Sequence, residues 1–414
     1  MKILIIGSGG REHALAAAFA RDVDPAGIAV APGNAGIARE FDCPQLKGNA
    51  QVLSWCMKNQ PDLVVVGPEQ PLSEGLSDLL EAHSIPCVGP SKAAARIETS
   101  KIFAKEMMAR HSIPTAEYHC FNDPDSARAH IRGLAQYPVV VKADILAAGK
   151  GVTIAGNAGV ALEAIGRMEQ SYGAQCGYVV EEYLEGWEVS LFAATDGVDF
   201  ASTLFSQDHK QLGEGDTGPN TGGMGAFCPV REAELWRGEI EEKIISPTLK
   251  ALRDEGCLYR GFLYFGLMIT ASGPKVLEYN CRLGDPETQA LLPLLKTPLA
   301  KVCFAILEGR VDELKLEWLD KSCVCVVLAS GGYPGNYEKG FPIMIGKDVK
   351  SRIFFSGVGL EAGSLITAGG RVLSVAAVAD SLDEARSQAY QDIQKIEFKG
   401  KYFRGDISQR TNKP

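Results

Sequence analysis

Three features that mark large classes of proteins are missing from this sequence. No apolar run reaches the roughly 18 to 20 residues that a membrane-spanning helix needs. The 11 cysteines are scattered without a C-x-x-C pair, which is neither a zinc pattern nor a small disulfide scaffold. Basic residues are not in excess, because 42 Lys and Arg stand against 51 Asp and Glu. We therefore expect reduced thiols, a cytoplasmic location, and neither a membrane nor a nucleic acid as partner.

The organisation of the chain points to several domains. A length of 414 residues suggests two to four domains at roughly 150 residues each, and 46% hydrophobic residues is ordinary for globular proteins. Short apolar runs alternate with helical stretches over the first hundred residues, which is the rhythm of a parallel βα sheet. No signal peptide is expected before the first strand-like run, which starts at Ile3.

The sequence pattern predicts particular elements. Strands are expected at residues 3–6, 28–31, 63–66, 139–142, 152–154, 178–180, 324–328, 352–356 and 372–379, and helices at 11–21, 53–59 and 382–396. We predict an α/β and α+β multidomain protein, with a βα domain at 1–99, a lid region at 100–187, a large domain at 188–320 and an α+β domain at 321–414.

A glycine loop joins the first strand to the first helix. Gly9 and Gly10 let a ligand approach the backbone, and the helix that begins near Arg11 favours a phosphate at its N-terminus. A dinucleotide site is disfavoured, because Glu12 replaces a small residue and the second strand ends without an acid. A phosphate or phosphosugar site is favoured, with a plain tight turn as the alternative.

A second loop, made of Gly67, Pro68 and Glu69, also follows an apolar strand. Ligands collect at the carboxyl ends of parallel strands. Glu69 is therefore either a partner for sugar hydroxyls or an exposed loop carboxylate.

Two lysines suggest a polyphosphate site. Lys142 interrupts a β-branched run, and Lys150 follows it in a small-residue turn at 147–151. Such a turn can expose amide groups to phosphates while the strand lysine approaches them from below. The motif is not a Walker A loop, because no Ser or Thr follows Lys150.

Two further strand ends carry polar residues. The strand exit at Glu181, Glu182, Tyr183 and Leu184, with Glu188 close behind, could hold adenine and ribose, although this pattern alone is weak.

Near residue 280, strand alternation places Glu278, Asn280 and Arg282 on one face, with Cys281 pointing to the core. Two oxygen ligands beside a cation suit magnesium and a transferring phosphoryl group, and a polar face exposed to water is the alternative.

A glycine-rich loop lies between residues 207 and 225. Loops of this kind in compact domains are usually binding loops, with disorder as the rival interpretation. His209 in this loop is expected to make structural hydrogen bonds and not to act as a general base.

Together these motifs resemble the phosphoribosylamine–glycine ligase family of the ATP-grasp superfamily, over nearly the whole chain. The segments that carry the resemblance are 7–15, 67–69, 142–144, 147–152, 207–210, 215–226, 260–264 and 280–289. The resemblance implies that the domain at 1–99 binds a phosphoribosyl group and that ATP-grasp domains follow it. It also implies ATP-dependent joining of glycine to 5-phosphoribosylamine through a glycyl phosphate, with Mg²⁺ or Mn²⁺, in purine biosynthesis. The implied partners are these two small molecules, with a monomer or weak homo-oligomer as the assembly.

The resemblance also implies roles for individual residues. The implied catalytic residues are Arg282, Lys142 and Asp216. The implied nucleotide contacts are Lys101, Lys142, Lys150, Glu181, Glu182, Tyr183, Leu184, Glu188 and Asn280, and the implied metal ligands are Glu278 and Asn280. The implied substrate contacts are Gly9, Gly10, Arg11, Gly67, Pro68, Glu69, Asp208, Asn220, Thr221 and Arg282.

Three positions depart from the family pattern. Ile145 stands where the family usually has glycine, and Ser356 and Ala368 stand where it more often has histidine and aspartate. Another ATP-grasp ligase or carboxylase acting on a different small acid is therefore the alternative function.

Overall fold

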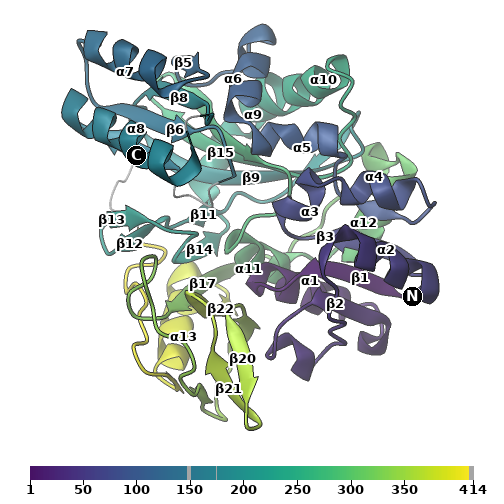
Figure 1. Ribbon diagram of the computed structural model, residues 1–414. Coiled ribbons are helices and arrows are strands. Elements are labelled where there is room, and N and C mark those ends of the chain that lie inside the picture. Colours follow the sequence, from purple (N-terminus) through teal and green to yellow (C-terminus); the bar gives the residue numbers. More distant parts are fainter. Residues whose placement is uncertain (147–150, 174, 410–414) are drawn as a thin grey trace.

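The computed structural model describes residues 1–146, 151–173 and 175–409 (Figure 1). Lys150, a predicted nucleotide contact, lies outside these residues. The main elements are one parallel sheet at the N-terminus and three antiparallel sheets of four or five strands after it. This arrangement confirms the predicted α/β and α+β class. Within the described ranges, no helix combines the length and the apolar character that crossing a bilayer would require.

The N-terminal sheet is parallel, as predicted, and lies at the lower right of Figure 1. Its strands, in the order β2-β1-β3-β4, are β1 (Ile3–Gly7), β2 (Ile28–Pro32), β3 (Leu63–Val66) and β4 (Cys87–Val88). Its helices are α1 (Gly10–Phe19), α2 (Gly48–Asn59), α3 (Glu69–Ser73), α4 (Leu76–Glu81) and α5 (Lys92–Thr99). Leu4 and Ile6 pack into one core while Ile3 and Ile5 pack into another. Strand β1 is continuously apolar because both of its faces are buried.

A small antiparallel sheet follows, in the order β5-β8-β6-β7. Its strands are β5 (Tyr118–Phe121), β6 (Val139–Ala143), β7 (Val152–Ala155) and β8 (Tyr178–Glu182). Helix α6 (Lys101–Arg110) precedes it, and α7 (Pro124–Gly133) and α8 (Ala158–Tyr172) pack together beside it at the upper left of Figure 1. Asp123 and Asn157 cap α7 and α8 by accepting hydrogen bonds from backbone amides three residues later.

A larger antiparallel sheet carries the predicted metal residues, in the order β10-β9-β15-β16. Its strands are β9 (Trp187–Thr195), β10 (Phe200–Ser202), β15 (Gly261–Thr270) and β16 (Gly273–Asn280). The helices around it are α9 (Arg237–Ile240), α10 (Ser246–Asp254), α11 (Glu287–Leu291) and α12 (Leu299–Glu308).

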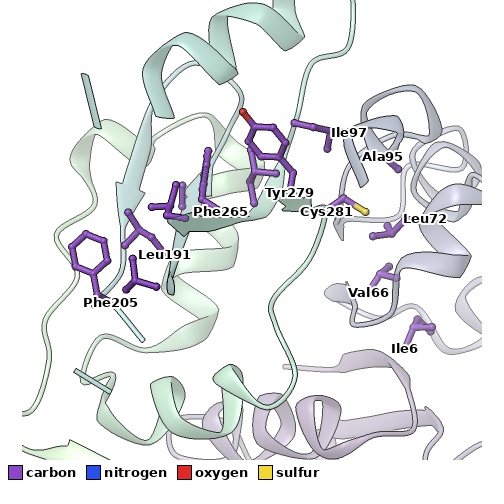
Figure 2. Packing of buried hydrophobic residues seen from close by; sticks show 14 of the residues in the cluster. Ile6, Val66, Leu72, Ala95, Ile97, Leu191, Phe205, Phe265, Tyr279 and Cys281 are labelled. Carbon is purple, nitrogen blue, oxygen red and sulfur yellow. The ribbon is translucent and has the colours of Figure 1, made fainter. Parts of the chain in front are cut away.

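Figure 2 shows how this sheet joins the N-terminal region. Phe265 and Tyr279 belong to the same buried cluster as Ile97 of α5 and Val66 of β3. Cys281 lies in that cluster, as predicted. The large sheet and the N-terminal sheet therefore share a continuous apolar core.

The last sheet combines strands from two distant parts of the chain, in the order β11-β14-β17-β22-β19. Its strands are β11 (Gln207–Asp208), β14 (Gly225–Cys228), β17 (Ser322–Ala329), β19 (Arg352–Phe355) and β22 (Arg371–Ala379), and α13 (Leu382–Ile393) packs on it. Two hairpins lie nearby: β12 (Gln211–Gly213) with β13 (Thr217–Asn220), and β20 (Val358–Glu361) with β21 (Ser364–Thr367).

The predicted helix at 382–396 is wrong at its C-terminal end. Helix α13 ends at Ile393, and Ile396 belongs to strand β23 (Ile396–Glu397), which pairs with β18 (Met344–Ile345). The side chain of Asp392 accepts hydrogen bonds from the backbone amides of Lys350 and Ser351. These bonds hold the helix end against the preceding loop, so that the chain turns and buries Ile396 in a strand.

Candidate functional site

A cavity of about 440 Å³ lies where the small sheet, the large sheet and the carboxyl end of β3 meet. This volume is typical of small-molecule sites, which span about 300 to 1,000 Å³. The predicted site residues that line it are Arg11, Pro68, Glu69, Lys101, Lys142, Glu181, Glu182, Tyr183, Leu184, Glu188, Asp208, Asn220, Thr221, Glu278, Asn280 and Arg282. Predicted residues from seven separate segments of the sequence therefore converge on one space.

Three lysines form one side of the cavity, which we call the cationic wall: Lys101 and Lys105 on α6, and Lys142 on β6. The Nζ atoms of Lys142 and Lys105 lie 2.9 and 3.3 Å from the two carboxylate oxygens of Glu181. Lys101 donates to the carbonyl of Ile145, at 2.8 Å. Burial lowers the pKa of Lys101, and it lowers the pKa of Lys105 to about 8 although Glu181 opposes the shift. Because Lys105 and Lys142 share one carboxylate and Lys101 bonds a neutral carbonyl, this wall can take an anion.

The end of strand β8 adds an apolar corner. Leu184 packs with Ala116 and Met268, and Leu277 packs against them. All four line the cavity beside Glu182, whose Oε1 accepts from Lys275 at 3.0 Å. A flat apolar surface next to polar groups suits a planar base.

Strand β16 brings two oxygen donors to the cavity. Glu278 and Asn280 both line it, and the Oε1 of Glu278 lies 3.5 Å from the Nζ of Lys210. Burial opposes ionisation of Glu278, but Lys210, Lys142 and Lys101 outweigh it and lower its pKa. An ionised carboxylate beside an amide oxygen fits a divalent cation that takes its other ligands from phosphates. Among the described residues no group of three or more His, Cys, Asp or Glu side chains forms a self-sufficient metal site.

Arg282 lines the cavity although it lies beyond the end of β16 at Asn280. The predicted alternation along one strand therefore does not account for its position. Its Nε lies 3.1 Å from Glu69 Oε2, and its Nη2 lies 2.8 Å from Glu98 Oε1. Burial opposes the charge of Arg282, yet Glu98 and Glu69 outweigh it and raise its pKa. The guanidinium is thus held in a fixed position by two carboxylates, on α5 and at the start of α3.

Four carboxylates form a second group of lining residues, which we call the acidic wall: Glu188, Asp208, Glu278 and Glu287. Lys210 faces this wall, with its Nζ 2.9 Å from Glu188 Oε2. Glu287 is buried and accepts from the Ser190 hydroxyl at 3.2 Å. Burial raises the pKa of both Asp208 and Glu287 despite the nearby lysine. The acidic wall therefore favours a cationic ligand.

The first glycine loop is packed against protein atoms. A Cβ on Gly10 would lie 2.7 Å from Gln289 Nε2 and 2.8 Å from Ser356 Oγ, and a Cβ on Gly67 would lie 2.0 Å from Glu12 Oε1. Glu12 also accepts from the amide of Gly9 at 2.6 Å. These close approaches explain why glycine is required there, and why Glu12 can occupy a position where a dinucleotide fingerprint has a small residue.

Some predicted residues are not at the cavity. Gly9, Gly10, Gly67 and Asp216 are not among the described residues that line it, although Gly67 lines a small adjoining pocket. The carboxylate of Asp216 lies 2.9 Å from Arg404 Nη1, at the hairpin of β12 and β13. His209 is buried and accepts from the amide of Ser408, as its structural prediction implies.

Sequence reasoning missed several lining residues, among them Lys105, Glu98, Glu287 and Arg371. Lys105 follows Lys101 by four residues on α6, a spacing that puts both on one helix face and could have identified it. Arg371 contributes from strand β22, and its Nη2 lies 2.9 Å from Asp285 Oδ2. No local motif predicts Glu98 or Arg371, since both reach the cavity only through tertiary packing.

The fold and the cavity place the chain in the ATP-grasp class. The biotin carboxylase domain of the Hydrogenobacter thermophilus 2-oxoglutarate carboxylase, solved with MgADP, shares this fold, with a TM-score of 0.71 over 97% of this chain and 91% of that one at 15% identity. Within this class the chain matches the phosphoribosylglycinamide synthetase N domain over residues 1–98, the ATP-grasp (A) domain over 99–288 and the C domain over 323–410. It belongs to the phosphoribosylglycinamide synthetase family.

Individual relatives agree with this assignment. The chain is 45% identical to the phosphoribosylamine–glycine ligase of Caldanaerobacter subterraneus subsp. tengcongensis and 43% identical to that of Rhizobium meliloti, each alignment covering 99% of both proteins. The crystal structure of the phosphoribosylamine–glycine ligase of Thermotoga maritima matches with a TM-score of 0.86 and 37% identity, over 98% of this chain and 100% of that one. The ATP-grasp family implies ATP with a divalent metal.

Proposed function

We propose that this protein is a phosphoribosylamine–glycine ligase of purine biosynthesis, which joins glycine to 5-phosphoribosylamine at the expense of ATP. Family membership over the whole chain supports this activity. The observation that carries the proposal is the division of one cavity into a cationic wall and an acidic wall. A polyphosphate and an amino acid can bind side by side in such a space.

The nucleotide would lie along the cationic wall. Lys101, Lys105 and Lys142 would hold its phosphates, with Lys150 of the turn as a further contact. The adenine would rest on the apolar corner between Glu181 and Leu184, and Glu188 would take the ribose hydroxyls.

Magnesium, with manganese as a substitute, would be held by Glu278 and Asn280, and when bound it would supply charge neutralisation at the phosphates.

Glycine would lie on the acidic wall. Asp208 and Glu287 would take its ammonium group, and Arg282 would face its carboxylate. Asn220 and Thr221, at the end of the glycine-rich loop, would close this side. The site then orients the carboxylate toward the nucleotide phosphates.

The second substrate would bind near the carboxyl ends of β1 and β3. Arg11, Pro68 and Glu69 line the cavity there, and the loop of Gly9, Gly10 and Gly67 shapes the adjoining backbone. In this position the amine of phosphoribosylamine would lie beside the glycine carboxyl carbon.

The chemistry then needs positioning and charge neutralisation, without a covalent enzyme intermediate. The glycine carboxylate attacks the terminal phosphorus of ATP, and ADP leaves. Lys142 and Arg282 neutralise the negative charge that builds up on the transferred group. The amine attacks the carbonyl carbon of glycyl phosphate and loses a proton, and phosphate leaves with the carbon–oxygen bond electrons.

We further propose that residues 1–99 bind the phosphoribosyl group, 100–187 form the lid, 188–320 hold the metal and 321–414 complete the substrate site. We also propose that the enzyme works in the cytoplasm as a monomer or weak homo-oligomer. The 11 cysteines form no disulfides in the structure, which supports the cytoplasmic location. Light scattering tests the oligomeric state.

The test is release of ADP and phosphate with Mg²⁺ and ATP, in the presence of glycine, of phosphoribosylamine made in situ, or of both. We expect turnover only with both substrates, and glycinamide ribonucleotide as the product in mass spectrometry. Tight ATP binding without turnover on glycine would contradict the proposal and favour an ATP-grasp ligase for a different small acid.

A further inference from the structure

The hairpin of β12 and β13 is held by the C-terminal segment of the chain, residues 402–408. Arg404 is fully buried, and its Nη1 donates to the carbonyl of Gln211 and to Asp216 Oδ1, both at 2.9 Å. Its Nε and Nη2 bond the two carboxylate oxygens of Asp406 at 2.8 and 2.7 Å. One guanidinium therefore connects strand β12 and the turn of the hairpin to the segment that carries Arg404.

Four further hydrogen bonds join the same two segments. Tyr402 donates its hydroxyl to the carbonyl of Leu212, and the amide of Gly215 donates to Asp406, both at 2.8 Å. The amide of Gly405 donates to Glu214 at 2.8 Å, and the amide of Ser408 donates to His209 at 3.2 Å. In Figure 1 the hairpin lies beside the yellow C-terminal part of the chain.

The tip of the hairpin is exposed to solvent. Residues 214–219 are exposed, and they include Asp216 with a φ of 54° and two glycines with positive φ. An exposed turn without a buried apolar side chain has little packing to resist movement. Among the described residues, the polar contacts with residues 402–408 therefore help to hold the hairpin in place.

Both ends of the hairpin lead directly into the cavity. Asp208 and Lys210 precede β12, and Asn220 and Thr221 end or follow β13, and all four line the cavity. The two ends are also tied together, because the amide and the hydroxyl of Thr221 both donate to the carbonyl of Lys210, at 2.7 and 2.8 Å. A shift of the hairpin would therefore displace side chains of the acidic side of the cavity.

We propose that Arg404 is a positioning residue for the glycine subsite: it fixes the hairpin through Asp216 and the Gln211 carbonyl, and thereby sets Asp208, Lys210, Asn220 and Thr221. Asp216 then acts from outside the cavity, and not on the substrates themselves. The inference rests on the proposed function and assigns to the C-terminal segment a part in recognising the amino acid. We call Arg404 and its contacts with Asp216 and Gln211 the clamp. Among the described residues, Lys101, Lys105 and Lys142 of the cationic wall bond Ile145, Thr115 and Leu277 instead.

The test compares Arg404→Gln and Asp216→Asn with Lys399→Gln. Asp216 is half-exposed, so we expect Asp216→Asn to keep the fold and to leave the Arg404–Asp406 pair in place. Lys399 serves as the control because it is an exposed residue of the same region that pairs with Glu338. We expect KM for glycine to rise about 10-fold in both clamp variants, with the Kd of MgADP changed by less than about twofold. Lys399→Gln should match the wild type in both.

A second readout does not depend on turnover. We expect faster amide hydrogen exchange in residues 211–221 of Asp216→Asn, with unchanged exchange in α6 and β6. Wild-type protein that fails to turn over glycine would sink the proposed function instead. An unchanged KM for glycine in folded Asp216→Asn, or an equal loss of glycine and MgADP affinity, would overturn the role of the clamp.

Discussion

The two walls of the cavity differ in charge and in the direction in which burial shifts their titration. On the cationic wall, burial lowers the pKa of Lys101 and Lys105, whereas on the acidic wall it raises the pKa of Asp208 and Glu287. In both cases burial disfavours the charged form, because nearby opposite charges do not fully offset the loss of solvent. Each wall is therefore stabilised in its ionised state by a ligand of opposite charge, an anion on one side and a cation on the other.

The largest effect is expected from breaking the cationic wall. Lys142→Met removes the strand lysine nearest Glu181 and should lower kcat about 100- to 1,000-fold, because charge neutralisation at the transferred group is lost. KM for glycine should stay close to the wild-type value. Steady-state kinetics measure both. Lys275→Met is the matched control, since Lys275 bonds Glu182 but is not among the described lining residues; equal losses in the two variants would contradict the assignment.

A smaller effect is expected from the acidic wall. Glu287→Gln keeps the size of the side chain and its contact with Ser190 but removes the negative charge. We expect KM for glycine to rise about 10- to 100-fold, a loss of roughly 1.4 to 2.8 kcal/mol, while KM for ATP stays unchanged. The variant Glu239→Gln, which removes a half-buried carboxylate paired with Lys243, serves as control. A rise in KM for ATP alone would reverse the assignment of the two walls.

The smallest effect is expected outside both walls, at the contact between α1 and β19. Burial opposes ionisation of Glu40, but hydrogen bonds from His13 and Arg352 outweigh it and lower its pKa from 4.5 to about 2. Its contribution is complete above pH 4.5 and is lost as the pH falls toward about 2, because the unfolded chain then binds the proton more tightly. The free energy of unfolding of Glu40→Gln should therefore fall less steeply between pH 4.5 and about 2 than that of the wild type. The difference should be less than about 1 kcal/mol, because Glu40 is partly solvated. Urea unfolding at several pH values measures it, and kinetics at neutral pH should be unchanged.

The sequence could predict the parts of the site that depend on local periodicity. Lys142, Glu278 and Asn280 sit on strands whose alternation points them into the cavity, and they line it together. It could not predict what Arg282 contacts, because Glu98 and Glu69 are far away in the chain. They come close only when α5 packs against β16 and α3 packs against α5.

The fold, too, has parts that the sequence predicts and parts that it does not. The parallel N-terminal sheet and most strand positions follow from apolar runs, but the end of α13 and the role of the glycine-rich hairpin do not. Asp216 illustrates the limit, since a motif places it near the site while its ion pair with Arg404 depends on residues nearly 190 positions later. Long-range polar contacts leave no periodic trace in a sequence.

The sheet of β11, β14, β17, β22 and β19 has a practical consequence for the production of fragments of this chain. Strand β14 pairs with β17 along its whole length, so a cut between residues 320 and 322 would leave an open edge on each fragment. Unpaired strand edges invite association with other chains. The C-terminal part should therefore neither dissolve well alone nor be exchangeable as a module between relatives unless residues 207–228 travel with it.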